Sequence, residues 1–110
     1  MSQTIAIVLH VREDAAAEFE RMFEQTVLPM WEDFVARRRF VEASLTPVED
    51  ETEAREDVRD YILHVEATAM DAHTEFDEHP IFTAWLPDAQ SLQVDEPIVW
   101  FGTTRFRVPP

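Results

Sequence analysis

The chain lacks cysteine, lysine and asparagine, and it contains a single glycine, Gly102. Without cysteine it can form no disulfide bonds, thiolate metal sites or cysteine nucleophiles. No apolar run approaches the roughly 18 residues that a membrane-spanning helix needs, and no basic segment precedes the short apolar run at residues 5–9. We therefore expect a cytoplasmic protein that does not bind membranes.

Basic residues are also scarce. The 110 residues include 23 acidic side chains and nine basic ones, all of them arginine, which gives a formal net charge of -14. A field of this sign repels nucleic acid, so we expect no nucleic-acid partner. The length allows one compact hydrophobic core and is too short for two, so we expect a single domain over residues 1–110.

The spacing of apolar residues predicts both strands and helices. A nearly continuous apolar run at Thr4–Val11 is typical of a strand that is covered on both faces. Large apolar residues at 19–34 recur at spacings of three and four, which predicts an amphipathic helix. Asp14 can cap the start of this helix, and Pro29 should kink or interrupt it. Three further strands are expected at residues 40–48, 59–69 and 96–108, the last with a bulge or close approach at Gly102.

The order of these elements is strand, helix, strand, strand, helix, strand. With the acidic segment Glu49–Asp57 as the loop of an antiparallel hairpin, this order predicts a ferredoxin-like α+β fold, βαββαβ, with a four-stranded antiparallel sheet. The helices of such a fold cover one face of the sheet and leave the other face for a second copy of the chain. We therefore expect a homodimer.

The segment Met70–Trp85 is rich in histidines and carboxylates. It contains two acid–histidine pairs at helical i, i+4 spacing, His73 with Asp77 and Glu75 with His79. The two pairs are about 200° apart around a helix, so one ion cannot bind all four side chains, and we expect no metal site. Pro80 favours extended backbone at His79. The segment should therefore form a helix that ends near Glu78 and a second one that starts at Pro80, with a further interruption at Pro87.

Three consecutive arginines, Arg37–Arg39, follow the first predicted helix. Positive charges are favourable at the C-terminal end of a helix because of its dipole. The alternative is an anion-binding site. The sequence alone leaves both interpretations open.

The residues from Tyr61 to Trp85 resemble the antibiotic biosynthesis monooxygenase family of dimeric α+β barrels. The resemblance lies in a strand ending in HVEA, a short helix MDAHTEFDE, a break, and then HPIFTAW. Glu66 stands at the place of the family's strand glutamate and Phe82 at that of the phenylalanine after the break. The family's common helix histidine falls on Phe76. A glycine is missing after the first helix, and the chain has none of the asparagines that haem-degrading members and several monooxygenases use.

The resemblance implies a pocket between helices and sheet within each subunit of a homodimer. It also implies a reaction without metal or flavin, in which a small phenolic or quinol-like molecule is deprotonated and reacts with oxygen itself. Such a reaction needs a base, and histidine is the natural choice. The pocket candidates are His10, Trp31, Phe34, Tyr61, His64, Glu66, Phe82 and Trp85.

His64 is the leading candidate for the catalytic base, because a histidine in an otherwise apolar strand must enter either the core or the pocket. The alternative is a structural histidine, or one that faces the partner subunit. His10 is equally ambiguous. Glu66 could accept a hydrogen bond in the pocket or form a salt bridge across the dimer, and Trp31 and Trp85 could simply be core residues.

Two functions remain open. The first is a cofactor-independent monooxygenase or isomerase acting on a small organic molecule. The second is a non-catalytic, ligand-binding or stress-associated dimer on the same scaffold, because a fold does not determine a function.

Overall fold

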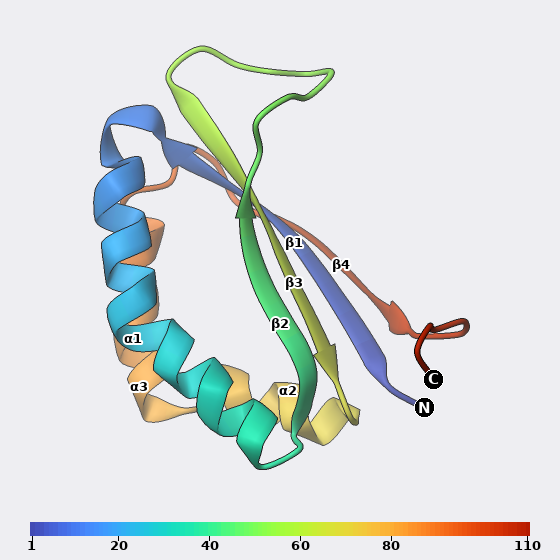
Figure 1. Ribbon diagram of the computed structural model, residues 1–110. Coiled ribbons are helices and arrows are strands. Elements are labelled where there is room, and N and C mark those ends of the chain that lie inside the picture. The colour runs from blue at the N-terminus through green and yellow to red at the C-terminus, as the bar shows by residue number, and fades with distance from the viewer.

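The computed structural model describes all 110 residues, as a sheet with helices packed on one of its faces (Figure 1). The strands are β1 (Gln3–Arg12), β2 (Phe40–Pro47), β3 (Val58–Ala67) and β4 (Ile98–Thr103). The helices are the 3-10 turn η1 (Glu13–Ala15), α1 (Ala16–Ala36), α2 (Met70–Asp77) and α3 (Pro80–Gln90). This order confirms the predicted βαββαβ arrangement, with its second helix divided in two.

The four strands are antiparallel and lie in the order β2-β3-β1-β4. The apolar strand β1 is central, as predicted, and Ile5 pairs with Val65 of β3 on one side and with Phe101 of β4 on the other. β2 is an edge strand, and Ser44 pairs there with His64 of β3. The fold is therefore the predicted ferredoxin-like α+β fold.

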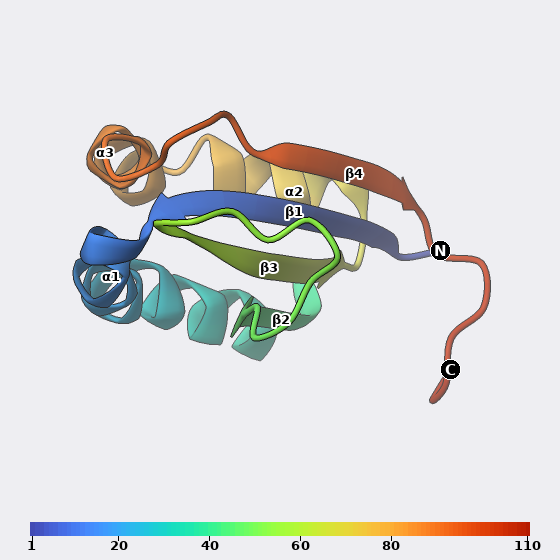
Figure 2. The ribbon, with the colours of Figure 1, turned by 90° about the horizontal axis from the view of Figure 1, so that it is seen from above.

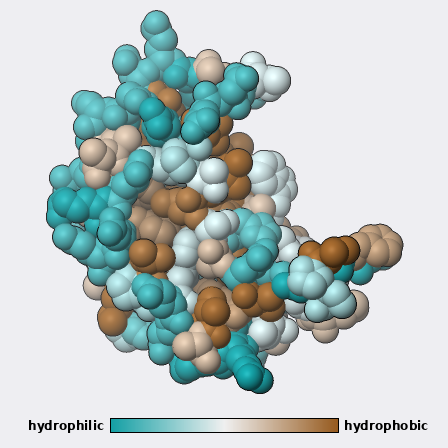
Figure 3. All heavy atoms as spheres, in the orientation of Figure 1, coloured by the Kyte–Doolittle hydropathy of each residue, from teal (hydrophilic) through white to brown (hydrophobic).

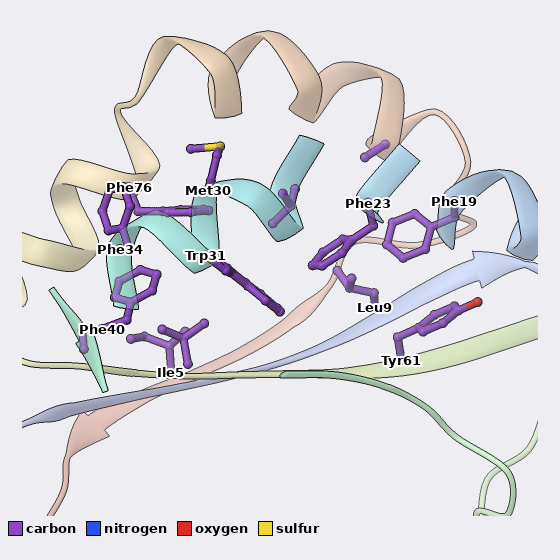
Figure 4. Close-up of a cluster of buried hydrophobic side chains, with 14 of the residues drawn as sticks. Ile5, Leu9, Phe19, Phe23, Met30, Trp31, Phe34, Phe40, Tyr61 and Phe76 are labelled. Carbon is purple, nitrogen blue, oxygen red and sulfur yellow. The ribbon is translucent and has the colours of Figure 1, made fainter. Parts of the chain in front are cut away.

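Alternate residues of the central strands face the helices and form the hydrophobic core. Figure 4 shows Ile5 and Tyr61 rising from the sheet toward Phe19 and Trp31 of α1. Burial of such large apolar side chains is the main contribution to stability. The core consists of Ile5, Leu9, Val11, Ala15, Phe19, Phe23, Val27, Met30, Trp31, Phe34, Phe40, Tyr61, Val65, Ala67, Ala72, Phe76 and Ala89.

The long helix α1 bends but does not break. It includes Pro29, and Figure 1 shows a change of direction part-way along it, in line with the expected kink. The expected cap at Asp14 is wrong. Asp14 lies inside the preceding 3-10 turn, and the residue before α1, Ala15, provides no side-chain cap.

The break between α2 and α3 lies where the sequence predicts it. His79 has extended backbone dihedrals, and its Nδ1 accepts a hydrogen bond of 3.1 Å from the backbone N–H of Ile81. Pro80 occupies the first turn of α3, where no intrahelical N–H is needed. The expected interruption at Pro87 is wrong, because α3 continues through Pro87 to Gln90.

The last strand is shorter than predicted. β4 covers six residues, Ile98–Thr103, and every one of them is exposed. Gly102 pairs with Thr4 in regular register, and a Cβ at this position would meet no atom within 4 Å, so it marks neither a bulge nor a close approach. The sheet's irregularity lies instead in β2, between Phe40 and Glu42.

Both chain ends lie at the same end of the sheet (Figure 2). There Glu66 accepts hydrogen bonds from the hydroxyl of Ser2, at 2.6 Å, and from Nε of Arg107, at 2.8 Å. Glu66 is thus a buried carboxylate, 4% exposed, that ties the two ends of the chain to β3. None of the helices is both long enough and apolar enough to span a membrane.

Candidate functional site

A cavity of about 140 Å³ lies between the helices and the sheet. Fifteen of its 20 wall residues are hydrophobic, so a ligand inside it would be largely shielded from water. β1 contributes Ile5, Ile7 and Leu9, and Figure 4 shows Phe23 and Trp31 reaching toward this strand from α1.

A surface depression between α1 and β2 leads toward the same aromatic residues. Figure 3 shows hydrophobic residues gathered in a hollow there, surrounded by hydrophilic ones. Phe23 and Trp31 belong both to this depression and to the cavity wall. The side chains of Phe23 and Trp31 thus separate the surface depression from the cavity.

Trp85 contributes the indole ring of the cavity wall. Its ring lies 5.8 Å from that of Phe23 in an edge-on arrangement and 5.9 Å from that of Phe82 in a stacked one. Its Nε1 is buried and has no hydrogen-bond partner. The indole N–H is therefore one buried donor that nothing in the chain satisfies.

His73 and Asp77 of α2 also line the cavity. Nε2 of His73 lies 3.2 Å from Oδ2 of Asp77. The imidazole stacks on Phe101 of β4, with ring centroids 6.1 Å apart. Burial raises the pKa of Asp77, an effect that the neighbouring His73 partly offsets. The pair thus places a potential base, oriented by a carboxylate, on a mostly apolar wall.

His64 lies on the open face of the sheet, opposite the cavity. Strand residues alternate between faces, and the helix-facing residues of β3 are its neighbours Leu63 and Val65, both on the cavity wall. The side chain of His64 is 35% exposed, and its Nδ1 lies 3.8 Å from Oε1 of Glu42. Its predicted role as catalytic base stays untested, but within one chain it does not reach the cavity.

Two further candidates from the sequence lie on that open face. Glu66 binds the chain ends there, and hydrogen bonds from Ser2 and Arg107 outweigh the effect of its burial, so that the pKa of Glu66 is lowered. Nδ1 of His10 forms a hydrogen bond of 2.7 Å with Oδ1 of Asp60. Neither lines the cavity.

The remaining candidates divide between the cavity and its surroundings. Trp31, Phe82 and Trp85 are on the cavity wall, whereas Phe34 and Tyr61 are not. Phe34 packs against Phe40 and Phe76 beyond the cavity. The Tyr61 hydroxyl donates a 2.6 Å hydrogen bond to Glu20, and burial, together with this contact, raises the pKa of Tyr61.

No three His, Asp or Glu side chains are grouped so that they could hold a metal ion. His73 and Asp77 form one pair on α2, while His79 and Glu75 are engaged elsewhere. His79 caps α3, and Glu75 binds Arg37 and Arg39 at 3.0 Å each.

Solved structures share this fold over nearly the whole chain. A proposed antibiotic biosynthesis monooxygenase from Caulobacter crescentus CB15 is 20% identical, with a TM-score of 0.73 over 96% of this chain and 91% of that one. A proposed member from Nitrosomonas europaea is 9% identical, with a TM-score of 0.74 over 94% and 89% of the two chains. The fold is that of the antibiotic biosynthesis monooxygenases.

One of these structural relatives is described by its chemistry. A mutant form of SnoaB from Streptomyces nogalater, a cofactor-independent oxygenase, is 24% identical, with a TM-score of 0.70 over 99% of this chain and 98% of that one. At such identities the likeness concerns the fold. No family model and no curated protein matches the sequence.

Sequence reasoning did not select His73 and Asp77 as pocket residues. It considered them only as two of four possible metal ligands, and rejected the metal site because the two acid–histidine pairs point to nearly opposite sides of a helix. The available signal was their position beside the apolar stripe Ala72 and Phe76, which α2 buries. Two side chains adjacent to a buried stripe lie at the boundary between core and solvent.

Proposed function

We propose that the cavity is the active site of a cofactor-independent oxygenase that acts on a phenol with a single aromatic ring. The observation that carries this proposal is a histidine–carboxylate pair on the wall of an apolar cavity. The size of the substrate follows from the volume, since a cavity of about 150 Å³ accommodates one benzene ring. The structural likeness to a cofactor-independent oxygenase supports the same reaction class.

His73 is the base in this proposal. Asp77 holds Nε2 of the imidazole, which leaves Nδ1 to accept the phenolic proton. The helix position where the resemblance places a histidine is occupied by Phe76, which also lines the cavity, and His73 precedes it by one turn of α2. A histidine from the same helix thus supplies the base from a neighbouring position.

The phenolate then reacts directly with molecular oxygen. One oxygen atom bonds to a ring carbon, and the other leaves as water with the phenolic hydrogen and the ring hydrogen. A phenol is thereby oxidised by four electrons to a quinone, and O₂ is reduced by four. The apolar walls contribute by excluding water from the phenolate and by raising the strength of its contacts with His73.

We also propose that the chain forms a homodimer through the open face of the sheet. Ile62 of β3 and Ile98 and Trp100 of β4 lie on this face, on either side of β1, and keep 44, 45 and 57% of their surface exposed. Exposed apolar patches of this kind are typical of interfaces. The partner would cover His64 as well. A cytoplasmic location stays a prediction from the sequence.

Oxygen uptake with simple phenols and hydroquinones tests the proposed reaction. We expect His73→Gln to lower the rate by about 100-fold or more, because the amide retains the shape of the side chain and cannot take a proton. His64→Gln is the matched control and should leave the rate unchanged.

Other outcomes would contradict the assignment. A loss confined to His64→Gln would move the base to the open face and to the dimer interface. Binding of phenols without any oxygen uptake would favour the second function, a ligand-binding dimer without chemistry.

A further inference from the structure

We infer that Phe101 is a positioning residue for His73: its ring fixes the plane of the imidazole at the cavity wall. This inference rests on the proposed function, in which His73 is the base. It adds a residue of β4 that does not itself line the cavity and that acts through His73.

The first observation is that Asp77 alone does not orient the imidazole. Asp77 lies 3.2 Å from a single ring atom, Nε2, and its own side chain is 51% exposed, so it can follow the imidazole toward solvent. The torsion that turns a histidine ring about its Cβ–Cγ bond is broad. A contact at one atom therefore places that atom and leaves the ring free to tilt.

The second observation is the stacked pair. The ring centroids of His73 and Phe101 are 6.1 Å apart, and the two planes differ by 21°. Aromatic rings at this separation attract each other, and the imidazole cannot tilt without losing part of the contact. With one atom placed by Asp77 and the plane placed by Phe101, the orientation of the imidazole is determined.

The third observation is how the sheet places Phe101. Phe101 pairs with Ile5 of β1, which is 1% exposed beneath the helices. Paired residues of antiparallel strands point to the same face, so Phe101 is on the helix-facing side. β4 is an edge strand, and Phe101 is 46% exposed there. The stack therefore joins α2 to the edge of the sheet, at a position that solvent reaches.

The fourth observation is that the imidazole is accessible. The side chain of His73 is 25% exposed. Its Nδ1 has no hydrogen-bond partner in the chain and is not fully buried, because the one buried side-chain nitrogen or oxygen without a partner is Nε1 of Trp85. An imidazole of this exposure has room to turn toward water. The stack on Phe101 thus determines how much of the time the base is held at the cavity wall.

Imidazole C–H resonances report the stack directly. The chain has four histidines, and His73→Gln identifies the signals of His73. Protons above the face of an aromatic ring resonate upfield, so we expect these signals upfield of those of free histidine. Phe101→Leu keeps an apolar side chain without the ring and should move the His73 signals downfield. Phe101→Tyr keeps the ring and should leave them in place.

Oxygen uptake measures the consequence for the reaction. In Phe101→Leu, we expect the rate at saturating phenol to fall roughly fivefold, the effect of losing one aromatic pair that orients the base. The affinity for phenol, measured in oxygen-free buffer, should stay the same, because Phe101 does not line the cavity. Phe101→Tyr should restore the rate.

Val99→Ala is the matched control. Val99 lies on the same face of β4, two residues before Phe101, and is 56% exposed. Its truncation should change neither the rate nor the His73 signals. The wild-type spectrum tests the stack even if Phe101→Leu does not fold.

Several results would overturn the inference: wild-type His73 signals at the positions of free histidine, signals that do not move in Phe101→Leu, no rescue by Phe101→Tyr, or an equal effect of Val99→Ala. Failure of the oxygenase is distinguishable. If the wild type consumes no oxygen and Phe101→Leu still releases the His73 signals, the reaction is refuted and the positioning stands. If Phe101→Leu consumes oxygen at the wild-type rate, the positioning is refuted and the reaction stands.

Discussion

Arg38 ends α1 in a conformation that costs stability. Its φ is 60°, in the left-handed region, where a side chain crowds the backbone and glycine is favoured. The turn itself is well bonded, because the N–H of Arg39 donates to the carbonyl of Phe34 at 2.8 Å and that of Arg38 to Val35 at 3.0 Å. The arginine side chain makes no ion pair, so nothing offsets the strain locally.

Arg38→Gly should therefore stabilise the protein. We expect the free energy of unfolding to rise by about 1 kcal/mol, since glycine adopts this φ without the Cβ contact. Urea denaturation followed by tryptophan fluorescence measures the change. Arg38→Ala removes the same charge and keeps the Cβ, so it should give no such gain; an equal gain would point to charge instead of backbone strain.

Residues of β3 alternate between the two faces of the sheet, and this alternation could be predicted from the sequence. The two-residue period correctly places His64 and Glu66 on one face. It does not say which face the helices cover, and with an apolar residue on each side of His64 both choices were plausible. Burial decides it: Tyr61 and Val65 are 0 and 6% exposed under the helices, while Ile62 is 44% exposed.

At the scale of elements, α2 is attached to the end of α1 by ion pairs. Glu75 binds Arg37 and Arg39 at 3.0 Å each, and Asp71 lies 3.5 Å from Arg39. Two of the three consecutive arginines thus bind carboxylates of the chain itself, in place of an external anion. The hydrogen bond from Arg37, aided by Arg39, lowers the pKa of Glu75 against a smaller opposing effect of burial.

Glu75→Gln should loosen α2, which holds His73. We expect backbone amides of α2 to exchange with deuterium roughly threefold faster at neutral pH, because exposed ion pairs contribute modestly. The folded-state pKa of Glu75 is lowered, so its contribution is complete above its ordinary value of 4.5 and is lost as the pH falls through the folded-state value. The difference between wild type and variant should therefore vanish in acid and shrink at high salt.

Glu78→Gln is the control for this experiment. Glu78 closes the same helix, undergoes the same chemical change and forms no ion pair. Faster exchange in Glu78→Gln as well, or a difference that persists at low pH, would show that the arginine contacts do not hold α2.

The boundaries of elements were harder to predict than their order. Extended backbone before Pro80 follows from a local steric clash and was predicted correctly. The continuation of α3 through Pro87 was not, because the cost of a proline inside a helix can be met by packing, and Ala89 beyond it is buried. β4 ends early for a similar reason, since its length depends on pairing with β1 and not on its own apolar pattern.

At the scale of the whole molecule, no helix covers the open face of the sheet. Trp100, midway along the edge strand β4, pairs with Ala6 of β1, whose small side chain leaves the indole 57% exposed. Large aromatic residues in such positions commonly contribute most to an interface.

Trp100→Glu should convert the proposed homodimer to a monomer, because it places a charge where the two sheets meet. Sedimentation velocity at several protein concentrations measures the change. Ile81→Glu alters a residue of similar exposure, 52%, on α3, and should leave the dimer intact. A wild-type chain that sediments as a monomer at all concentrations would refute the dimer itself.

The cavity and the open face lie on opposite sides of one sheet. In a pair joined through the open faces, the two cavities therefore point outward, each separated from the other by two layers of strands. A ligand in one cavity touches no residue of the other subunit and has no direct means of changing the second affinity. Such a dimer would take up its two ligands independently, with a Hill coefficient of about 1.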